Sequence, residues 1–93
     1  MVVESRIPVP GKRIAARLIE EQAYLLDPRK EELQCLNEVG SFVWAQIAER
    51  RFSVAALGLA VVERFEVSHE EAARDLREFL IELESLGFID YMD

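Results

Sequence analysis

The chain has few of the residues that build chemical centres. Its 93 residues include one histidine, one cysteine and four glycines. A zinc site needs several nitrogen or sulfur ligands, and a lone cysteine excludes an internal disulfide. Cys35 would be a nucleophile only beside a base, and the four glycines are too scattered to form a phosphate-binding loop. We therefore expect no catalytic residue, no metal and no cofactor, and a protein that is not an enzyme.

Cations are also scarce. The chain has eleven Lys and Arg residues but eighteen Asp and Glu residues, which gives a net charge of −7. Binding to nucleic acid or to anionic lipid needs clustered cations, so neither partner is expected. The longest apolar stretch of a predicted helix, Val54–Val62, is too short to span a bilayer. The first residues lack the apolar segment of a signal peptide, and the single reduced cysteine fits a cytoplasmic protein.

What is present suffices for one domain. About half of the residues, 51%, are hydrophobic, and a chain of this length buries one core but not two. Residues 1–12 contain Pro8 and Pro10, which cannot donate hydrogen bonds to a sheet, and are predicted to be an extended N-terminal tail. The domain then spans residues 13–93. A tail that exchanges with another copy would give a homodimer, and the sequence leaves that open.

Three short apolar segments predict an antiparallel meander. They are Arg13–Ile19, Ala23–Leu26 and Glu31–Leu36, separated by a polar turn at Glu20–Gln22 and a turn that begins at Asp27-Pro28. Leu33 and Cys35 alternate with Gln34, so they point to one face of the third strand. A helix over Ile14–Gln22 is the alternative on propensity alone.

Three helices are predicted after the strands. Asn37, Ser53 and Ser68 are suitable N-caps, and the helices are expected to end near Glu49, Phe65 and Gly87. Gly58, inside the second helix, is where another helix is expected to approach closely. Strands followed by helices predict an α+β fold, winged-helix-like, with a three-stranded antiparallel sheet before a three-helix bundle.

The last helix is the most strongly marked element. Ser68 and Glu71 have the spacing of a capping box, and Gly87 is placed for a left-handed stop. Phe79 lies at one border of its apolar stripe, with Asp75 and Glu82 just outside it and Glu78 a little further out. The other acids are explained as surface charge, with ion pairs from Arg74 to Glu70 and Glu78. Six acids and two arginines give the helix a charge of −4, which disfavours a helix-turn-helix that binds DNA.

Several short motifs along the chain resemble the PqqD family. The resemblance runs from about residue 13 to residue 89. It rests on Leu36-Asn37-Glu38-Val39-Gly40, Val43-Trp44, Arg51-Phe52-Ser53-Val54, Phe65-Glu66-Val67, Ala73, Asp75-Leu76, Phe79-Leu80, Leu83 and Gly87-Phe88-Ile89. The combination of the Leu-Asn start, the tryptophan of the first helix and the closing Leu…Gly-Phe-Ile is more specific than any one piece.

The resemblance implies a winged-helix-like peptide chaperone. Such proteins capture the leader of a ribosomally made precursor, in pyrroloquinoline quinone or other modified-peptide pathways, and present it to a modifying enzyme, often a radical S-adenosylmethionine protein. In the family, the leader adds as a strand beside the third strand and lies against the third helix. The implied peptide-binding residues are Leu33, Gln34, Cys35, Asp75, Glu78, Phe79 and Glu82. The alternatives are that Leu33, Cys35 and Phe79 simply fill the core, that the domain is a DNA-binding regulator, or that it is an adaptor that docks only on an enzyme.

Overall fold

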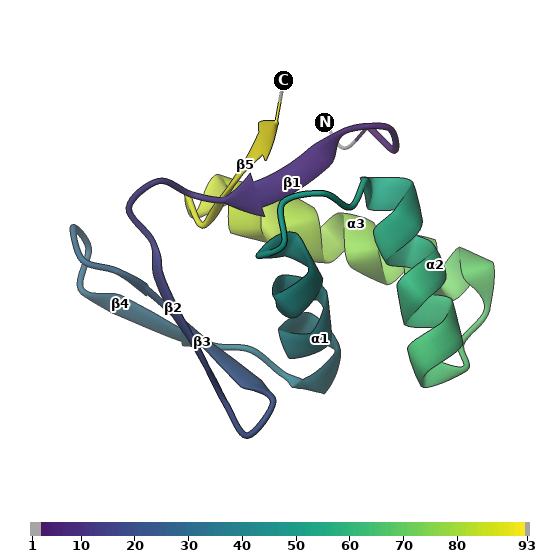
Figure 1. Ribbon diagram of the computed structural model, residues 1–93, viewed down its shortest axis with the longest axis horizontal. Coiled ribbons are helices and arrows are strands. Elements are labelled where there is room, and N and C mark those ends of the chain that lie inside the picture. Colours follow the sequence, from purple (N-terminus) through teal and green to yellow (C-terminus); the bar gives the residue numbers. More distant parts are fainter. Residues whose placement is uncertain (1–2, 93) are drawn as a thin grey trace.

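A three-stranded sheet and three helices make up most of the molecule (Figure 1). The structure, a computed structural model, describes residues 3–92. The elements are β1 (Ile7–Pro10), β2 (Ala15–Ile19), β3 (Gln22–Asp27), β4 (Glu32–Cys35), α1 (Glu38–Ile47), α2 (Val54–Phe65), α3 (His69–Ser85) and β5 (Ile89–Met92). The antiparallel sheet has the order β2-β3-β4 and precedes the three helices, which confirms the predicted α+β class. The alternative helix over Ile14–Gln22 is wrong, since this segment forms β2 and the turn into β3.

The N-terminal segment is more than a tail. Ile7–Pro10 forms β1, which pairs antiparallel with β5, with Ile7 opposite Met92 and Pro10 opposite Ile89. Pro8 and Val9 are buried. The Gly11 N–H donates to the Phe88 carbonyl at 2.9 Å, so the bonded positions of β1 alternate back to Val9 and Ile7. Pro8 and Pro10 are therefore tolerated, because their nitrogens point away from β5. The partner strand β5 brings the chain's last described residues, Tyr91 and Met92, into the same small sheet. Met1, Val2 and Asp93 lie outside the described residues.

The helix caps match the predicted ones. Asn37 Oδ1 accepts from the Gly40 N–H at 2.8 Å, Ser53 Oγ from Ala56 at 3.2 Å and Ser68 Oγ from Glu71 at 3.1 Å. Gly87 has φ +81°, the left-handed conformation expected after the last helix. Each side-chain oxygen satisfies a backbone donor that has no partner inside the helix. These local contacts fix where the helices begin and thus which residues face the core.

A buried serine fastens the sheet to the first helix. Trp44 and Ile47 of α1 pack with Leu25 of β3 in the core. Beside them, the Ala23 N–H donates to Ser41 Oγ at 2.8 Å, and the Ser41 hydroxyl donates to the Leu36 carbonyl at 3.1 Å. This hydroxyl satisfies one backbone group from each strand at the point where β4 ends. It therefore holds β3, the end of β4 and α1 in a fixed arrangement.

The turn between β2 and β3 is strained. Glu20 and Glu21 have φ values of +52° and +68°, which suit the two-residue turn of a right-twisted hairpin but favour Asn and Gly. We expect the double change Glu20→Asn and Glu21→Gly to raise the free energy of unfolding by about 1–2 kcal/mol. Denaturant unfolding measures this. The control, Glu20→Gln with Glu21→Gln, removes the same charges but keeps the strain, and equal stabilisation by both variants would contradict this explanation.

Candidate functional site

The strand β4 has an open edge. Among the described residues it pairs only with β3, with Leu25 opposite Gln34 and Leu26 opposite Leu33. The Leu36 N–H donates to the Ala23 carbonyl at 3.0 Å. Because hydrogen-bonded pairs alternate in an antiparallel ladder, Gln34 also bonds to β3, whereas the backbone groups of Leu33 and Cys35 point away from it. Two N–H and two C=O groups are thus directed at the open edge.

The side chains of β4 alternate as expected. Leu33 is 64% exposed and Cys35 is also exposed, both on the outer face of the sheet, whereas Gln34 lies half-buried on the inner face. Gln22 Nε2 donates to Cys35 Sγ at 2.9 Å across that outer face. The alternative that Leu33 and Cys35 fill the core is therefore wrong. What these residues offer to a partner is mainly their backbone.

The four predicted residues of α3 line one groove. Asp75, Glu78, Phe79 and Glu82 face a hollow of about 340 Å³, which we call the α3 groove. Phe79 is half-buried and packs against the core, whereas the three acids are exposed. The groove thus combines an apolar floor with an acidic wall. Further apolar lining comes from Ala72 and Leu76 of α3 itself and from α1, α2 and the α2–α3 connection, including Val39, Gly40, Val43, Phe65 and Val67.

The far wall of this groove, which includes Val39 and Gly40 of α1, was not among the predicted site residues. A Cβ atom on Gly40 would lie 3.1 Å from Phe79 Cε1 and 3.2 Å from Asn37 Oδ1, so α1 and α3 meet closely there. That close approach was expected at Gly58, where a Cβ would find only Leu76 Cδ2 at 3.9 Å. A glycine in the first turn of a helix was the available signal, since a Gly inside a helix is unfavourable unless packing or function requires it.

The open edge of β4 lies beside α3. Just before β4, Lys30 Nζ donates to the Leu86 carbonyl at 3.2 Å. In the first turn of α1, which follows β4, Gly40 approaches Phe79 closely, as described above. The segment from Lys30 to Gly40, which contains β4, is therefore held against the second half of α3 near both of its ends. Leu33, Gln34 and Cys35 do not line the α3 groove, but Asn37, two residues after Cys35, does.

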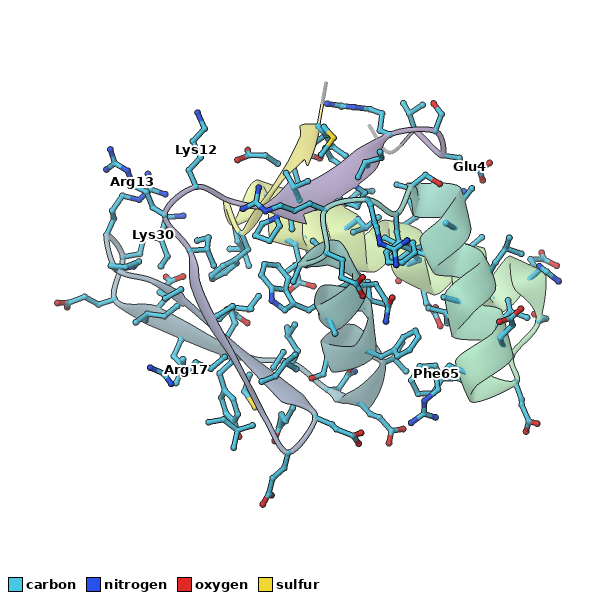
Figure 2. All side chains as sticks on the ribbon, in the orientation of Figure 1. Glu4, Lys12, Arg13, Arg17, Lys30 and Phe65 are labelled. Carbon is cyan, nitrogen blue, oxygen red and sulfur yellow. The ribbon has the colours of Figure 1, made fainter. Side chains whose placement is uncertain are left out.

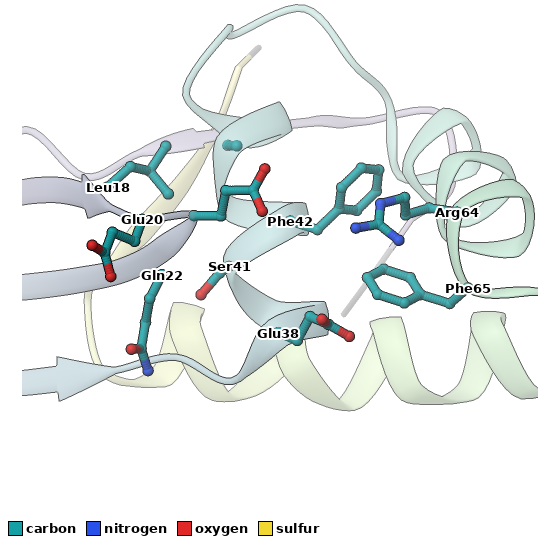
Figure 3. Close-up of a pocket in the computed structure, with 10 residues that line it drawn as sticks. Leu18, Glu20, Gln22, Glu38, Ser41, Phe42, Arg64 and Phe65 are labelled. Carbon is teal, nitrogen blue, oxygen red and sulfur yellow. The ribbon is translucent and has the colours of Figure 1, made fainter.

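A second hollow lies on the other side of α1. It measures about 440 Å³ between the β2–β3 turn, α1 and the end of α2, and Leu18, Phe42 and Arg64 are among its lining residues (Figure 3). Phe65 lines both hollows, and its ring packs edge-on against Phe42 with centroids 5.5 Å apart. This hollow adjoins β2 and the turn rather than the open edge of β4. It is less suited to an added strand that must also reach α3.

Of the three acids of the α3 groove, Asp75 has a cationic neighbour, and no ion pair of Glu78 or Glu82 is formed among the described residues. Arg74 Nε lies 3.6 Å from Asp75 Oδ1, and both side chains are more than half exposed. The expected ion pairs from Arg74 to Glu70 and Glu78 are not formed in the described part of the chain. None of the described residues that line the groove is Lys or Arg. Its field is therefore negative and repels phosphate.

Other kinds of site find no support in the described residues. Across residues 3–92, no three His, Cys, Asp or Glu side chains come together as metal ligands would. Within the same range, none of the helices has both the length and the hydropathy of a membrane span.

The turn into β4 depends on a charged group. Arg29 donates from its backbone N–H and from its guanidinium to Asp27, at 3.0–3.3 Å. These bonds, chiefly that of the Arg29 side chain, lower the pKa of Asp27 below its usual value. A lowered pKa in the folded state contributes stability that is complete above the unfolded-state value and is lost as the pH falls through the folded-state value.

We expect acid to loosen this turn. Wild-type stability should decline below about pH 4, and Asp27→Asn should be less stable at neutral pH and lose less of its stability on acidification. Denaturant unfolding at a series of pH values measures both. Asp90→Asn, at an exposed position of β5, is the control. Parallel curves for wild type and Asp27→Asn would contradict the role given to Asp27.

Comparisons with known proteins identify what the chain is similar to. The model of the family described as coenzyme PQQ synthesis protein D (PqqD) matches residues 22–89. A solved structure described as TbiB1 in complex with the TbiA(beta) leader peptide is 23% identical, with a TM-score of 0.82, and the match covers 91% of this chain and 99% of that one. A second solved structure, described as lasso peptide synthetase B1 complexed with the leader peptide, is 20% identical, with a TM-score of 0.80. The match covers 90% of this chain and 98% of that one. No curated protein matches the sequence.

Proposed function

Because the chain belongs to the PqqD family, we propose that it is a non-enzymatic peptide chaperone that captures the leader of a ribosomally made precursor. The leader pairs as a strand with the open edge of β4 and places its inward side chains in the α3 groove. The observation that carries this proposal is the open edge itself, with the backbone of Leu33 and Cys35 directed outward beside α3. The two structurally similar proteins were solved with leader peptides bound, which supports the same role here.

The energetics of such binding are sufficient. The four outward backbone groups of Leu33 and Cys35 each contribute about 0.5–1.5 kcal/mol when paired. One or two apolar side chains in the groove add about 1.5–3 kcal/mol each. After the ordering of a flexible peptide is subtracted, affinity in the micromolar range or better remains. Strand addition supplies affinity through the backbone, and the groove supplies selection.

The partners follow from this role. We propose that the captured leader is presented to a modifying enzyme, of the radical S-adenosylmethionine type in one class of pathway, and that the protein acts in the cytoplasm. Homodimer formation remains a prediction. The negative α3 groove and the −4 charge of α3 disfavour the DNA-binding alternative. An adaptor that docks only on an enzyme would have no use for an open strand edge beside an apolar groove.

Titration with a leader peptide and with DNA distinguishes leader capture from the DNA-binding and adaptor functions. A fluorescent leader peptide, taken from the precursor encoded next to this chain, should bind with a dissociation constant in the micromolar range or below. A labelled DNA duplex should not bind at low salt. Binding of the duplex with a steep salt dependence would support the regulator instead. Enzyme capture without any leader binding would support the adaptor.

A further inference from the structure

The negative charge of the protein is concentrated in its helical half. Residues 12–36 hold five Lys or Arg and five Asp or Glu, whereas residues 37–92 hold five and eleven. Figure 2 shows Lys12, Arg13 and Arg17 at the sheet, whereas Phe65 of the α3 groove lies on the side of the helices. Lys30 contacts α3 at Leu86, one turn beyond Glu82, but neither it nor any other described cation lines the groove, so a peptide in the groove meets an acidic surface.

Three acids of the α3 groove lie where side chains of an added strand can contact them. Asp75, Glu78 and Glu82 stand on one wall of the groove. Glu78 and Glu82 are four residues apart on α3, about 6 Å along the helix axis. Alternate side chains of an extended peptide are about 6.6 Å apart. Two side chains on the inward face of an added strand can thus reach these two carboxylates together.

The floor of the same groove selects apolar side chains. Phe79, Val39 and Phe65 line it, and Val39 is 37% exposed in the free protein. Because Gly40 has no side chain, the Phe79 ring packs close against α1 and leaves the rest of the groove open. An occupant that fits must therefore offer apolar side chains to the floor and positive charge to the wall.

We infer that the leader recognised here carries Lys or Arg on the same strand face as its apolar anchors. This inference rests on the proposed function and names the chemical class of peptide that the site selects. The basic side chains lie two residues apart from one another or from an anchor, opposite Glu78 and Glu82. Their pairing with the acidic wall gives selectivity and faster association more than it gives affinity.

A random library of displayed twelve-residue peptides tests the inference. We expect the peptides selected on the wild-type protein to be enriched in Lys and Arg at positions that alternate with large apolar residues. The charge-reversed variant, Glu78→Lys with Glu82→Lys, should bind them about tenfold more weakly or worse, because two attractions become repulsions. Wild-type binding should also weaken as salt is added.

The control reverses the same amount of charge elsewhere on the helix. Glu70→Lys with Glu84→Lys changes two exposed acids of α3 outside the groove, and its binding should stay within about twofold of wild type. Peptides that bind wild type at β4 without basic enrichment, or equally well to the charge-reversed variant, overturn the inference but leave leader capture intact. Selection of no peptide, or of peptides that do not bind at the β4 edge, overturns the proposed function and the inference with it.

Discussion

Replacement of Cys35 by proline is expected to lower peptide affinity roughly hundredfold while the protein stays folded. The Cys35 N–H points to the open edge of β4, so the change removes no bond to β3. Proline is tolerated at such an edge position. The proline ring occupies the place of the incoming carbonyl, which loses a hydrogen bond and is left without a partner. Isothermal titration with a leader peptide, beside a melting curve, measures both effects.

Two variants make this result specific. Ala16 has its backbone directed at the other open edge of the sheet, since Arg17 and Ala15 bond to β3 across from Tyr24 and Leu26. Ala16→Pro should therefore keep wild-type affinity. Cys35→Ala removes only the exposed thiol and keeps the backbone N–H, so it should also keep wild-type affinity for the peptide. Wild-type affinity in Cys35→Pro, or an equal loss in Ala16→Pro, would show that peptides do not add at β4.

Replacement of Gly40 by alanine is expected to weaken peptide binding, the second large effect that the structure predicts. The new methyl group would lie 3.1 Å from the Phe79 ring, which is half-buried and can move toward the groove. In the free protein the better helix propensity of alanine offsets about 1 kcal/mol of the crowding. With peptide in the groove the ring has no room, so overpacking of about 1–3 kcal/mol weakens binding by roughly 5- to 100-fold.

A second helical glycine provides the matched control. Around Gly58 a Cβ would make only an ordinary contact with Leu76, so Gly58→Ala should stabilise α2 by about 1 kcal/mol without a change in binding. Thermal unfolding and titration of both alanine variants test this pair. If Gly40→Ala binds peptide as tightly as wild type, the peptide does not anchor against the Phe79 ring beside α1.

The parts of the fold that follow from neighbouring residues were predictable. The N-caps Asn37, Ser53 and Ser68 depend on contacts within one turn, and each was identified from residue type and spacing. The Asp27-Pro28 turn and the alternation along β4 are equally local. The pairing of β1 with β5 was not predictable, because its partners are about eighty residues apart and two prolines argued against a strand.

The candidate site likewise has one part that could be predicted from the sequence and one part that could not. Asp75, Glu78, Phe79 and Glu82 share one border of an amphipathic helix, so helical periodicity alone places them together. The opposite wall, with Gly40 and Val39, comes from another helix and depends on how α1 packs. That packing is set by contacts such as those of Ser41 with β3 and β4, for which no sequence pattern exists.

Amide hydrogen exchange of three neighbouring residues tests the central claim most directly. In the free protein, the Gln34 amide should exchange slowly because it bonds to β3, and those of Leu33 and Cys35 should exchange rapidly. With saturating leader peptide, we predict that Leu33 and Cys35 become protected while Ala16 and Leu18 on β2 stay unchanged. Rapid exchange of Leu33 and Cys35 in the saturated complex would contradict capture of the peptide at the edge of β4.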